Sequence, residues 1–157
     1  KVAKQAITIT KNFDLNKITL DLTRQLEIAG KVIRKEHVQR LERGQGVKGP
    51  LAKLKSSTIA KKTKGDYPTN ASKPLVNTGK MRNLVYKVDK QKQEVNIYPG
   101  RDKFYKGTRV TMSDVGAFHQ EGAGNLPKRE WFGYTAKSEK DIVKRIELEI
   151  ERQIKRA

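Results

Sequence analysis

The fold is decided by residues 84–98, which read LVYKVDKQKQEVNIY. Apolar residues recur at every second position over 84–88 and again over 95–97, on either side of a polar link at 89–93. Because successive side chains of a strand point to opposite faces, this period of two predicts two half-buried strands joined as a β-hairpin. Pro99 is followed by glycine, and this pair predicts the end of the second strand.

A long helical pattern precedes the hairpin. Apolar residues recur at spacings of three and four from Leu15 to Ile33, which places them on one face of a helix. Asp14 is the expected N-cap of this helix, and Gly44 is its expected stop. His37 falls on the polar side of the pattern, so we expect it to be a surface histidine.

A second helical pattern ends the chain. Ser138 and Asp141 resemble a capping box, and the helix that they open carries a stripe of isoleucines at positions 142, 146, 150 and 154. With the hairpin between the two helices, the predicted fold class is α+β. We expect a small, mainly antiparallel sheet flanked by a long N-terminal helix and a C-terminal helix, in a single domain over 1–157.

Shorter elements fill the space between these landmarks. They are a strand over 2–9, a short helix capped by Ser56 or Ser57 and running through Lys62, a brief helix around 80–83 capped by Thr78, a strand over 108–112, and a short helix opened by Ser113 and Asp114. Glycine-rich and proline-rich stretches surround the helix that ends at Lys62, which predicts a flexible basic arm at about 44–73. Its Gly-x-Gly-x-x-Gly pattern at 44–49 follows a helix rather than a strand, so it predicts a linker and not a dinucleotide site.

The chain of 157 residues is strongly basic, with 35 Lys and Arg against 17 Asp and Glu and a formal net charge of +18. Most of the excess lies in residues 44–112, where sixteen basic and four acidic side chains give +12. The flanking segments 1–43, 113–136 and 137–157 carry only +5, −1 and +2. A localised positive segment of this kind is typical of a surface that meets a polyanion or an acidic partner. No apolar run approaches the roughly 18 residues needed to span a bilayer, so no membrane partner is expected.

The composition offers little for catalysis or metal binding. The chain has no cysteine, which excludes disulfides, cysteine zinc sites and thiol catalysis, and it has only two histidines. For His119 we expect a structural hydrogen bond, with Glu121 or Asp114 as partner, because no serine nucleophile motif or second histidine accompanies it. The acidic residues show no two-metal or paired-carboxylate spacing. We therefore expect no enzymatic activity, no catalytic residue, no cofactor and no metal.

Four segments together resemble a known family. Residues 73–84 (KPLVNTGKMRNL) are similar to the "PLvdTGrLrdSi" element of the phage virion morphogenesis family, also called tail completion proteins. Residues 115–122 (VGAFHQEG) and 126–133 (LPKREWFG) resemble the family's "YAaiHQfG" and "iPaRpFlG" elements, and 54–62 (LKSSTIAKK) resembles "LspsTlarK". The four occur in the family's order, at about its spacing, between the expected N-terminal and C-terminal helices.

The resemblance implies a structural virion protein that completes the phage tail or the head–tail junction by assembling as a ring at the neck. Its implied partners are further copies of itself and other neck, connector and tail proteins, and its implied location is the virion, after synthesis in the bacterial host cytoplasm. The matching positions give the candidate assembly residues: Pro74, Thr78, Gly79, Arg82, His119, Gln120, Gly122, Pro127, Arg129, Trp131 and Phe132. Among these we expect Arg82 and Arg129 to pair with carboxylates at subunit interfaces, and Trp131 and Phe132 to be core or interface anchors, with the core favoured.

The basic segment leaves alternatives open. Its candidate contacts are Lys53, Lys55, Lys61, Lys62 and Lys64. They are expected to meet DNA phosphates non-specifically in the conduit, to meet an acidic partner ring, or to be a solvated surface. The alternative function, from another class, is a free basic nucleic-acid-binding protein.

Overall fold

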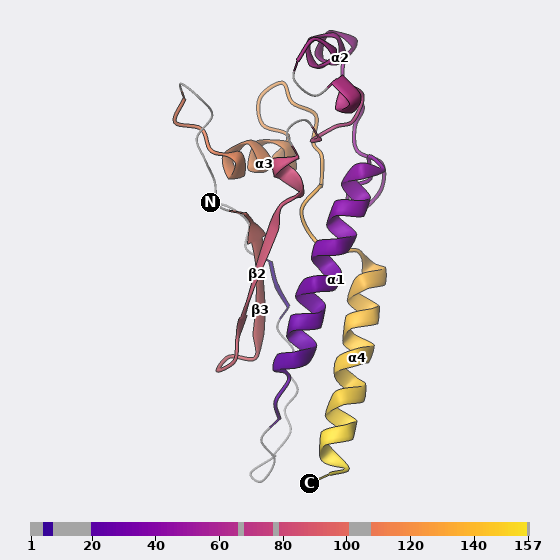
Figure 1. Ribbon diagram of the computed structural model, residues 1–157, viewed down its shortest axis with the longest axis vertical. Coiled ribbons are helices and arrows are strands. Elements are labelled where there is room, and N and C mark those ends of the chain that lie inside the picture. The colour runs from indigo at the N-terminus through magenta and orange to yellow at the C-terminus, as the bar shows by residue number, and fades with distance from the viewer. Residues whose placement is uncertain (1–4, 8–19, 66–67, 77–78, 101–107, 157) are drawn as a thin grey trace.

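The structure is a computed structural model that describes residues 5–7, 20–65, 68–76, 79–100 and 108–156. In chain order the elements are β1 (Gln5–Ile7), α1 (Thr23–Glu42), α2 (Ser56–Thr63), the 3-10 helices η1 (Pro68–Asn70) and η2 (Lys80–Arg82), β2 (Leu84–Asp89), β3 (Glu94–Pro99), α3 (Met112–Glu121) and α4 (Ala136–Ile154). Figure 1 shows the β2–β3 hairpin on one side of α1 and α4 on the other, with α2 at one end of the molecule. The predicted α+β class is confirmed.

The sheet is three-stranded and antiparallel, in the order β1-β3-β2. The predicted hairpin is confirmed: Leu84 pairs with Pro99 at its open end, and Asp89 pairs with Glu94 beside the turn. The alternation buries Val95 and Leu84 to 1 % exposure each, on the face that α1 covers. The part of the predicted strand 2–9 that the structure describes is β1, and the remainder lies outside the described residues.

Helix α1 packs against the inner face of the hairpin. Its stripe of Leu26, Ala29 and Ile33 is buried to 2 % exposure or less, as the spacing of three and four predicts. A Cβ placed on Gly30 would lie 2.5 Å from the ring of Tyr86, so the absence of a side chain there lets the helix approach β2 closely. The position of the sheet against α1 therefore depends on this contact as well as on the apolar stripe.

The predicted start of the long helix is wrong. Residues 20–22 are not helical, and α1 begins at Thr23, whereas Asp14 lies outside the described residues. Three hydrogen bonds fix the backbone just before and at the start of α1. Asp21 N–H donates to Gln153 of α4, and Leu22 N–H donates to Gln93 of the hairpin turn at 2.7 Å. The third is local, from Thr23 N–H to Asp21 Oδ1. Two of these backbone donors therefore have tertiary partners, and the third has a local side-chain partner. The predicted end is nearly right, since the helix ends at Glu42 and Gly44 has a φ of +66°.

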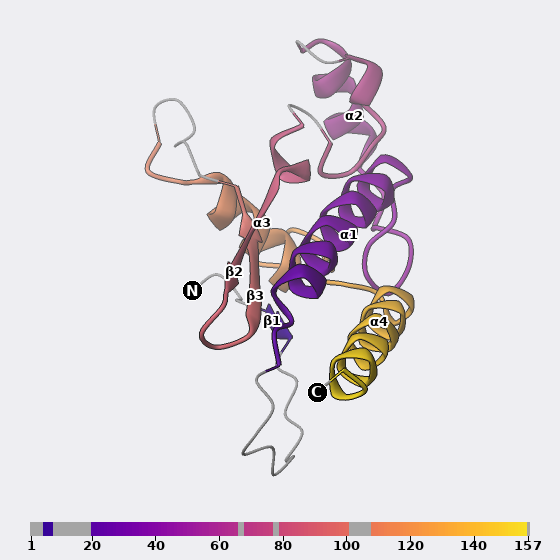
Figure 2. The same ribbon diagram turned by 60° about the horizontal axis from the view of Figure 1, so that its bottom comes forward.

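Helix α4 lies alongside α1 in both views of the ribbon, on the side away from the hairpin (Figures 1 and 2). Its Ile142 and Ile146 are 3 % and 1 % exposed, whereas the isoleucine stripe fades toward Ile154, which is 38 % exposed. The predicted cap is wrong by three residues. Thr135 is the N-cap, and Ser138 is its capping-box partner at the third position of the helix. The Ser138 hydroxyl, which was expected to be the N-cap group, instead accepts from the N–H of Thr135.

Two predictions around α3 are also wrong. Residues 108–111 form no strand element, and the helix begins at Met112. The N-cap is Thr111, whose hydroxyl accepts from the N–H of Asp114, while the Asp114 carboxylate accepts from Thr111 N–H at 2.8 Å. Asp114 is thus the third residue of the helix rather than its opener. The capping box needs both residues, and the sequence pattern identified only the second.

One hydrophobic core joins α1, α4, the sheet and the segment 131–132. The predicted short helix is confirmed as α2, which buries none of its residues, but its predicted serine cap is wrong, because the N-cap is Lys55 and no side chain caps the helix. The chain between α1 and α2 turns back on itself: Gln45 bridges to Pro50, and Val47 N–H donates to Glu130 O at 2.7 Å. The flexibility of the arm at 44–73 stays a prediction, but its first part contacts the body of the protein through these bonds.

Candidate functional site

Arg129 joins two of the four segments on which the family resemblance rests, 115–122 and 126–133, and it also binds the two residues immediately before 54–62. Its guanidinium donates from Nε to Ala52 O at 2.9 Å and from Nη2 to Lys53 O at 3.3 Å, and Nη1 lies 3.0 Å from Nδ1 of His119. Its own N–H donates to His119 O at 2.7 Å. Arg129 is only 4 % exposed, so its fork is used inside the chain. The predicted pairing of Arg129 with an interface carboxylate is wrong, because backbone carbonyls and an imidazole occupy its donors.

His119 is held as the neutral partner of this arginine. Burial, and secondly the charge of Arg129, lower the pKa of His119 below its ordinary value. A neutral ring can accept the Arg129 hydrogen bond at Nδ1, which then requires the ring proton to be on Nε2. The predicted structural hydrogen bond of His119 is confirmed, but its partner is Arg129 and not Glu121 or Asp114.

Gln120 and Trp131 form the second link between α3 and the 126–133 segment. The side-chain oxygen of Gln120 accepts from the N–H groups of Trp131 and Phe132 at 3.0 and 3.1 Å, and the indole N–H of Trp131 donates to Gly116 O at 2.8 Å. Trp131 and Phe132 are 2 % and 6 % exposed, which confirms the core position favoured from the sequence. A Cβ at Gly116 would lie 2.5 Å from the indole and 3.2 Å from the Met81 side chain, so only glycine fits this crossing.

The 73–84 segment enters the same cluster through Met81 and His37. Nε2 of His37 lies 2.9 Å from Met81 O, and its ring stands 5.5 Å, centroid to centroid, from that of Trp131. His37 has 0 % exposure, so the predicted surface position is wrong. Burial is the largest cause that lowers the pKa of His37 to about 4, which keeps the ring neutral and able to donate from Nε2.

The remaining predicted assembly residues have separate positions. Arg82 forms an ion pair with Glu42 of its own chain at 2.8 Å on the surface, so a carboxylate partner is present, though not from another subunit. Pro74 is buried and Pro127 is exposed. Gly79 and Gly122 have φ values of +78° and +73°, which glycine adopts without strain where η2 begins and α3 ends. Thr78, the predicted cap of the brief helix around 80–83, lies outside the described residues; that helix is η2, and its N-cap is Gly79, with no side-chain cap.

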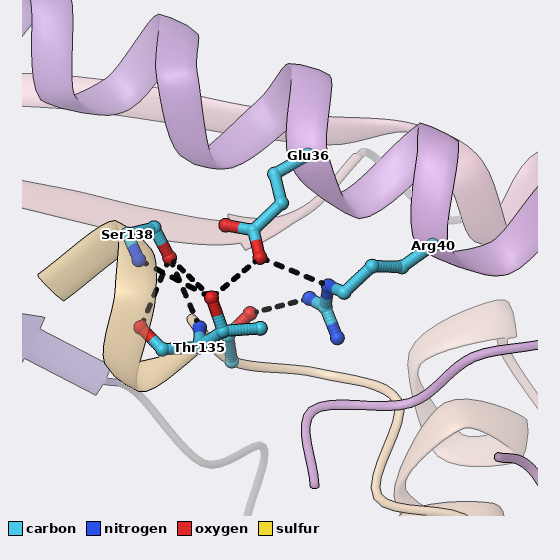
Figure 3. Close-up of polar contacts among 5 residues, drawn as sticks. Glu36, Arg40, Thr135 and Ser138 are labelled. Atoms are coloured by element: carbon cyan, nitrogen blue, oxygen red, sulfur yellow. Dashed lines mark hydrogen bonds and ion pairs between the residues drawn. The ribbon is translucent and has the colours of Figure 1, made fainter. Parts of the chain in front are cut away.

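A second buried polar cluster holds α4 to α1 and was not predicted (Figure 3). Glu36 accepts from the Thr135 hydroxyl at 2.7 Å and lies 3.6 Å from Nε of Arg40, and Arg40 Nη2 donates to Gly133 O at 2.7 Å. Figure 3 shows these side chains between α1 and the start of α4, around the capping box of Thr135 and Ser138. A signal was available, because positions 37 and 40 continue the spacing of the buried stripe that includes Ile33.

The five candidate lysines differ in their exposure and in their hydrogen bonds. Lys53, Lys55, Lys61 and Lys64 are exposed. Lys62 is different, because its Nζ donates to three carbonyl oxygens, those of Asn70, Lys73 and Val76, at 2.8, 2.8 and 3.2 Å. Desolvation lowers the pKa of Lys62 from its ordinary value. The prediction that Lys62 contacts DNA or an acidic partner is therefore wrong, since its ammonium group fixes α2 to the 70–76 loop.

A groove separates α2 and its approach from the α3 end of the cluster. It has a volume of about 810 Å³, with Met81, Leu75 and Val76 among its apolar residues and His119 and Arg129 among its polar ones. Lys53, Lys55 and Thr58 line it from the α2 side, and residues 124–127 line it from the other. The four segments thus build both a rigid cluster and the walls of a groove.

Within the described ranges, no group of three or more His, Asp or Glu side chains is placed to hold a metal ion. Over the same residues, no helix combines the length and apolar character that crossing a membrane requires. The comparisons with known proteins add no relative: no protein-family model, curated protein or solved structure matches this chain.

Proposed function

We propose that this protein is a structural component of a tailed-phage virion, or of a phage-derived particle, that completes the tail or the head–tail junction by assembling as a ring. The observation that carries the proposal is the convergence of four separated segments on one cluster. Residues 54–62, 73–84, 115–122 and 126–133 are the segments that resemble the tail completion family. Lys62 binds carbonyls of 73–84, Met81 packs beside Gly116 of 115–122, and Arg129 contacts His119. Motifs that match by chance would not be expected to pack together.

The chemistry of the cluster supports assembly rather than turnover. His119 and His37 have lowered pKa values and fixed partners, and Arg129 is committed to backbone carbonyls. A general base or a nucleophile needs an available reactive atom facing a substrate. His37 is buried, and although His119 and Arg129 line the groove, Nδ1 of His119 is occupied by Arg129 and the Arg129 donors bind carbonyl oxygens. The cluster therefore acts as a rigid support that presents surfaces to other proteins. We extend this to the proposal that the protein is not an enzyme.

The surfaces available for ring contacts carry exposed apolar side chains, none of which belongs to α2. On the outer face of the hairpin, Val85 and Tyr98 stand directly opposite each other and are 37 % and 40 % exposed. The other large exposed apolar side chains are Phe118, Leu126, Val143, Leu148 and Ile154. Strand β2 is an edge of the described sheet. In a closed ring each copy contributes two different faces, so an edge strand and an apolar helix surface are a suitable pair.

The proposal is tested by deleting the coding gene from the phage or prophage that carries it and imaging the particles by negative-stain electron microscopy. The expected result is separate heads and tails, or tails without a finished end, with normal particles restored by the wild-type gene in trans. A matched complementation with an Arg129→Lys variant is expected to fail, whereas Arg82→Lys, at an exposed ion pair, is expected to succeed. Complete, infectious particles from the deletion would contradict the proposal.

The second candidate is a free basic nucleic-acid-binding protein, which the +12 charge of residues 44–112 favours. That function predicts tight, salt-sensitive binding by the isolated monomer, with no role in particle completion. The assembly function predicts weak binding by one copy and a cyclic oligomer in particles. The deletion experiment separates them, because loss of a free nucleic-acid binder would leave head–tail joining intact.

A further inference from the structure

We infer that the end of the molecule formed by α2 and the residues before it binds the phosphate backbone of DNA. We call this surface the basic tip and define it by Lys53, Lys55, Lys61 and Lys64. The inference deepens the proposed function, on which it rests for the source of the DNA, namely the genome that passes through the neck. It names the partner of the basic segment and chooses DNA over an acidic protein ring.

The basic tip is the part of the chain where positive charge is least compensated. Residues 43–65 contain seven Lys and Arg and no Asp or Glu. One of these seven, Lys48, pairs with Glu130, and outside this stretch Arg82 pairs with Glu42 and Lys128 with Glu130. No such ion pair involves the four tip lysines among the described residues, although all four are exposed. Their charge is therefore available to a partner.

The position of α2 fits a contact surface better than a packing role. The helix has eight residues and buries none of them, and among the named elements it makes its main contacts with η1. An isolated helix of this length is marginal in water, so it needs an anchor. That anchor is Lys62, which binds the carbonyls of Asn70, Lys73 and Val76. Both views show α2 at the outer end of the molecule, beyond the end of α1 (Figures 1 and 2). The result is a fixed, exposed helix with lysines around it.

The side chains at the tip favour phosphate over protein. Protein interfaces are usually centred on buried aromatic, apolar or arginine anchors and are poor in lysine. None of the large exposed apolar residues lies within 43–65, and α2 presents the hydroxyls of Ser56, Ser57 and Thr58 beside the lysines. Lysine and hydroxyl side chains are the usual partners of phosphate oxygens, and they carry no sequence information. The basic tip is thus suited to contact the sugar-phosphate backbone of DNA that moves past it.

The test measures binding of the full chain to a short fluorescein-labelled DNA duplex by anisotropy over a range of salt concentrations. If four lysines each neutralise one phosphate, the slope of log K against log salt is about −3.6, and affinity falls about 100-fold between about 50 and 200 mM salt. A variant that combines K53Q, K55Q, K61Q and K64Q is expected to bind at least about tenfold more weakly at low salt, with a slope near zero. Lys62 is retained so that α2 stays in place.

The matched control combines K35Q, K137Q, K140Q and K144Q, which removes the same charge from exposed positions on α1 and α4. It is expected to keep the wild-type slope and to change affinity by less than about threefold. Equal losses in the two variants, or no binding by the wild-type chain, would overturn the inference. So would displacement of the duplex by poly-L-glutamate at equal charge concentration, since this would assign the tip to an acidic protein. None of these results depends on particle assembly, so a failure here leaves the deletion experiment to judge the proposed function separately.

Discussion

The guanidinium of Arg129 and the imidazole of His119 lie 3.0 Å apart, Nη1 to Nδ1, in the interior of the chain. The contact is unusual because a cation normally pairs with an anion, and here the second group is kept neutral by burial and by the arginine itself. The other donors of Arg129 point to the carbonyls of Ala52 and Lys53, so one side chain connects residues 52–53 of the 44–73 arm to α3 and to its own loop.

Replacement of Arg129 by lysine is expected to lower the free energy of unfolding by about 2–4 kcal/mol. A single ammonium group cannot reproduce a fork that reaches three acceptors, and buried acceptors left without donors are destabilising. Urea denaturation followed by circular dichroism measures the change. Arg82→Lys is the control, because its exposed pair with Glu42 contributes at most about 1 kcal/mol. Equal, small effects of the two substitutions would show that the Arg129 network is not structural.

The buried imidazole of His37 is expected to make stability depend on pH. Its pKa is about 4 in the folded protein against 6.5 for an ordinary histidine, so the unfolded chain takes up the proton first as the pH falls. Stability is therefore fully present above about pH 6.5 and declines toward pH 4, by about 2 kcal/mol by pH 4.5. His37→Gln retains a donor for Met81 O and should remove most of this decline, whatever its effect at neutral pH. The measurement is the urea midpoint as a function of pH. An unchanged slope in the variant would contradict the account.

The crossing of Gly116 and Trp131 is expected to tolerate no side chain. In Gly116→Ala the new Cβ would lie 2.5 Å from the indole, and the Trp131 ring is too enclosed to move without breaking its bond to Gly116 O. We expect a loss of about 2–3 kcal/mol in the free energy of unfolding. Gly65→Ala is the control, since its nearest contact is an ordinary 3.4 Å and the residue is exposed. A stable Gly116→Ala protein with unchanged Trp131 fluorescence would contradict this packing.

The ammonium group of Lys62 is expected to control the order of α2 and little else. Lys62→Met keeps the length of the side chain but removes the three donors to Asn70, Lys73 and Val76. Amide hydrogen exchange over Ser56–Thr63 should become faster by an order of magnitude or more, since about 1.4 kcal/mol of local stability is a factor of ten, while exchange in α1 and α4 stays unchanged. Lys61→Met, at an exposed neighbouring position, should change neither. Faster exchange throughout the chain would mean that α2 belongs to the global core.

Sequence patterns predicted the elements in which the spacing of apolar residues determines which side chains are buried. They failed where a hydrogen bond to a distant segment determines where an element begins. The alternation over 84–98 predicts the hairpin because one face must be buried, and the structure has the strands at Leu84–Asp89 and Glu94–Pro99. The helix start was misplaced because Leu22 gives its N–H to Gln93, a contact made 71 residues away. The N-caps of α3 and α4 were missed for the same reason. In each case a threonine lies three residues before a second residue that can also cap a helix, Asp114 or Ser138, and only the backbone geometry shows that the threonine is the N-cap.

The candidate site was predicted in its residues and not in its bonds. The family resemblance singled out Arg129, His119, Gln120 and Trp131 from two separate motifs, and the structure brings them into one cluster. Their partners could not be predicted, because Arg129 binds carbonyl oxygens that any residue at positions 52 and 53 would supply. His37 was misassigned for a different reason: it was placed on the polar side of the helix, although its spacing from Ile33 continues the buried stripe, where Met81 O is its hydrogen-bond partner.

The most direct test of the central claim is the location of this chain in finished particles. Cryo-electron microscopy of wild-type virions, with this structure fitted into the density, measures it. The account predicts a closed ring of identical copies at the head-proximal end of the tail, with apolar surfaces such as Val85 and Tyr98 between neighbours and the basic tip toward the DNA conduit. Particles with a complete neck in which no copy of this chain is present would contradict it.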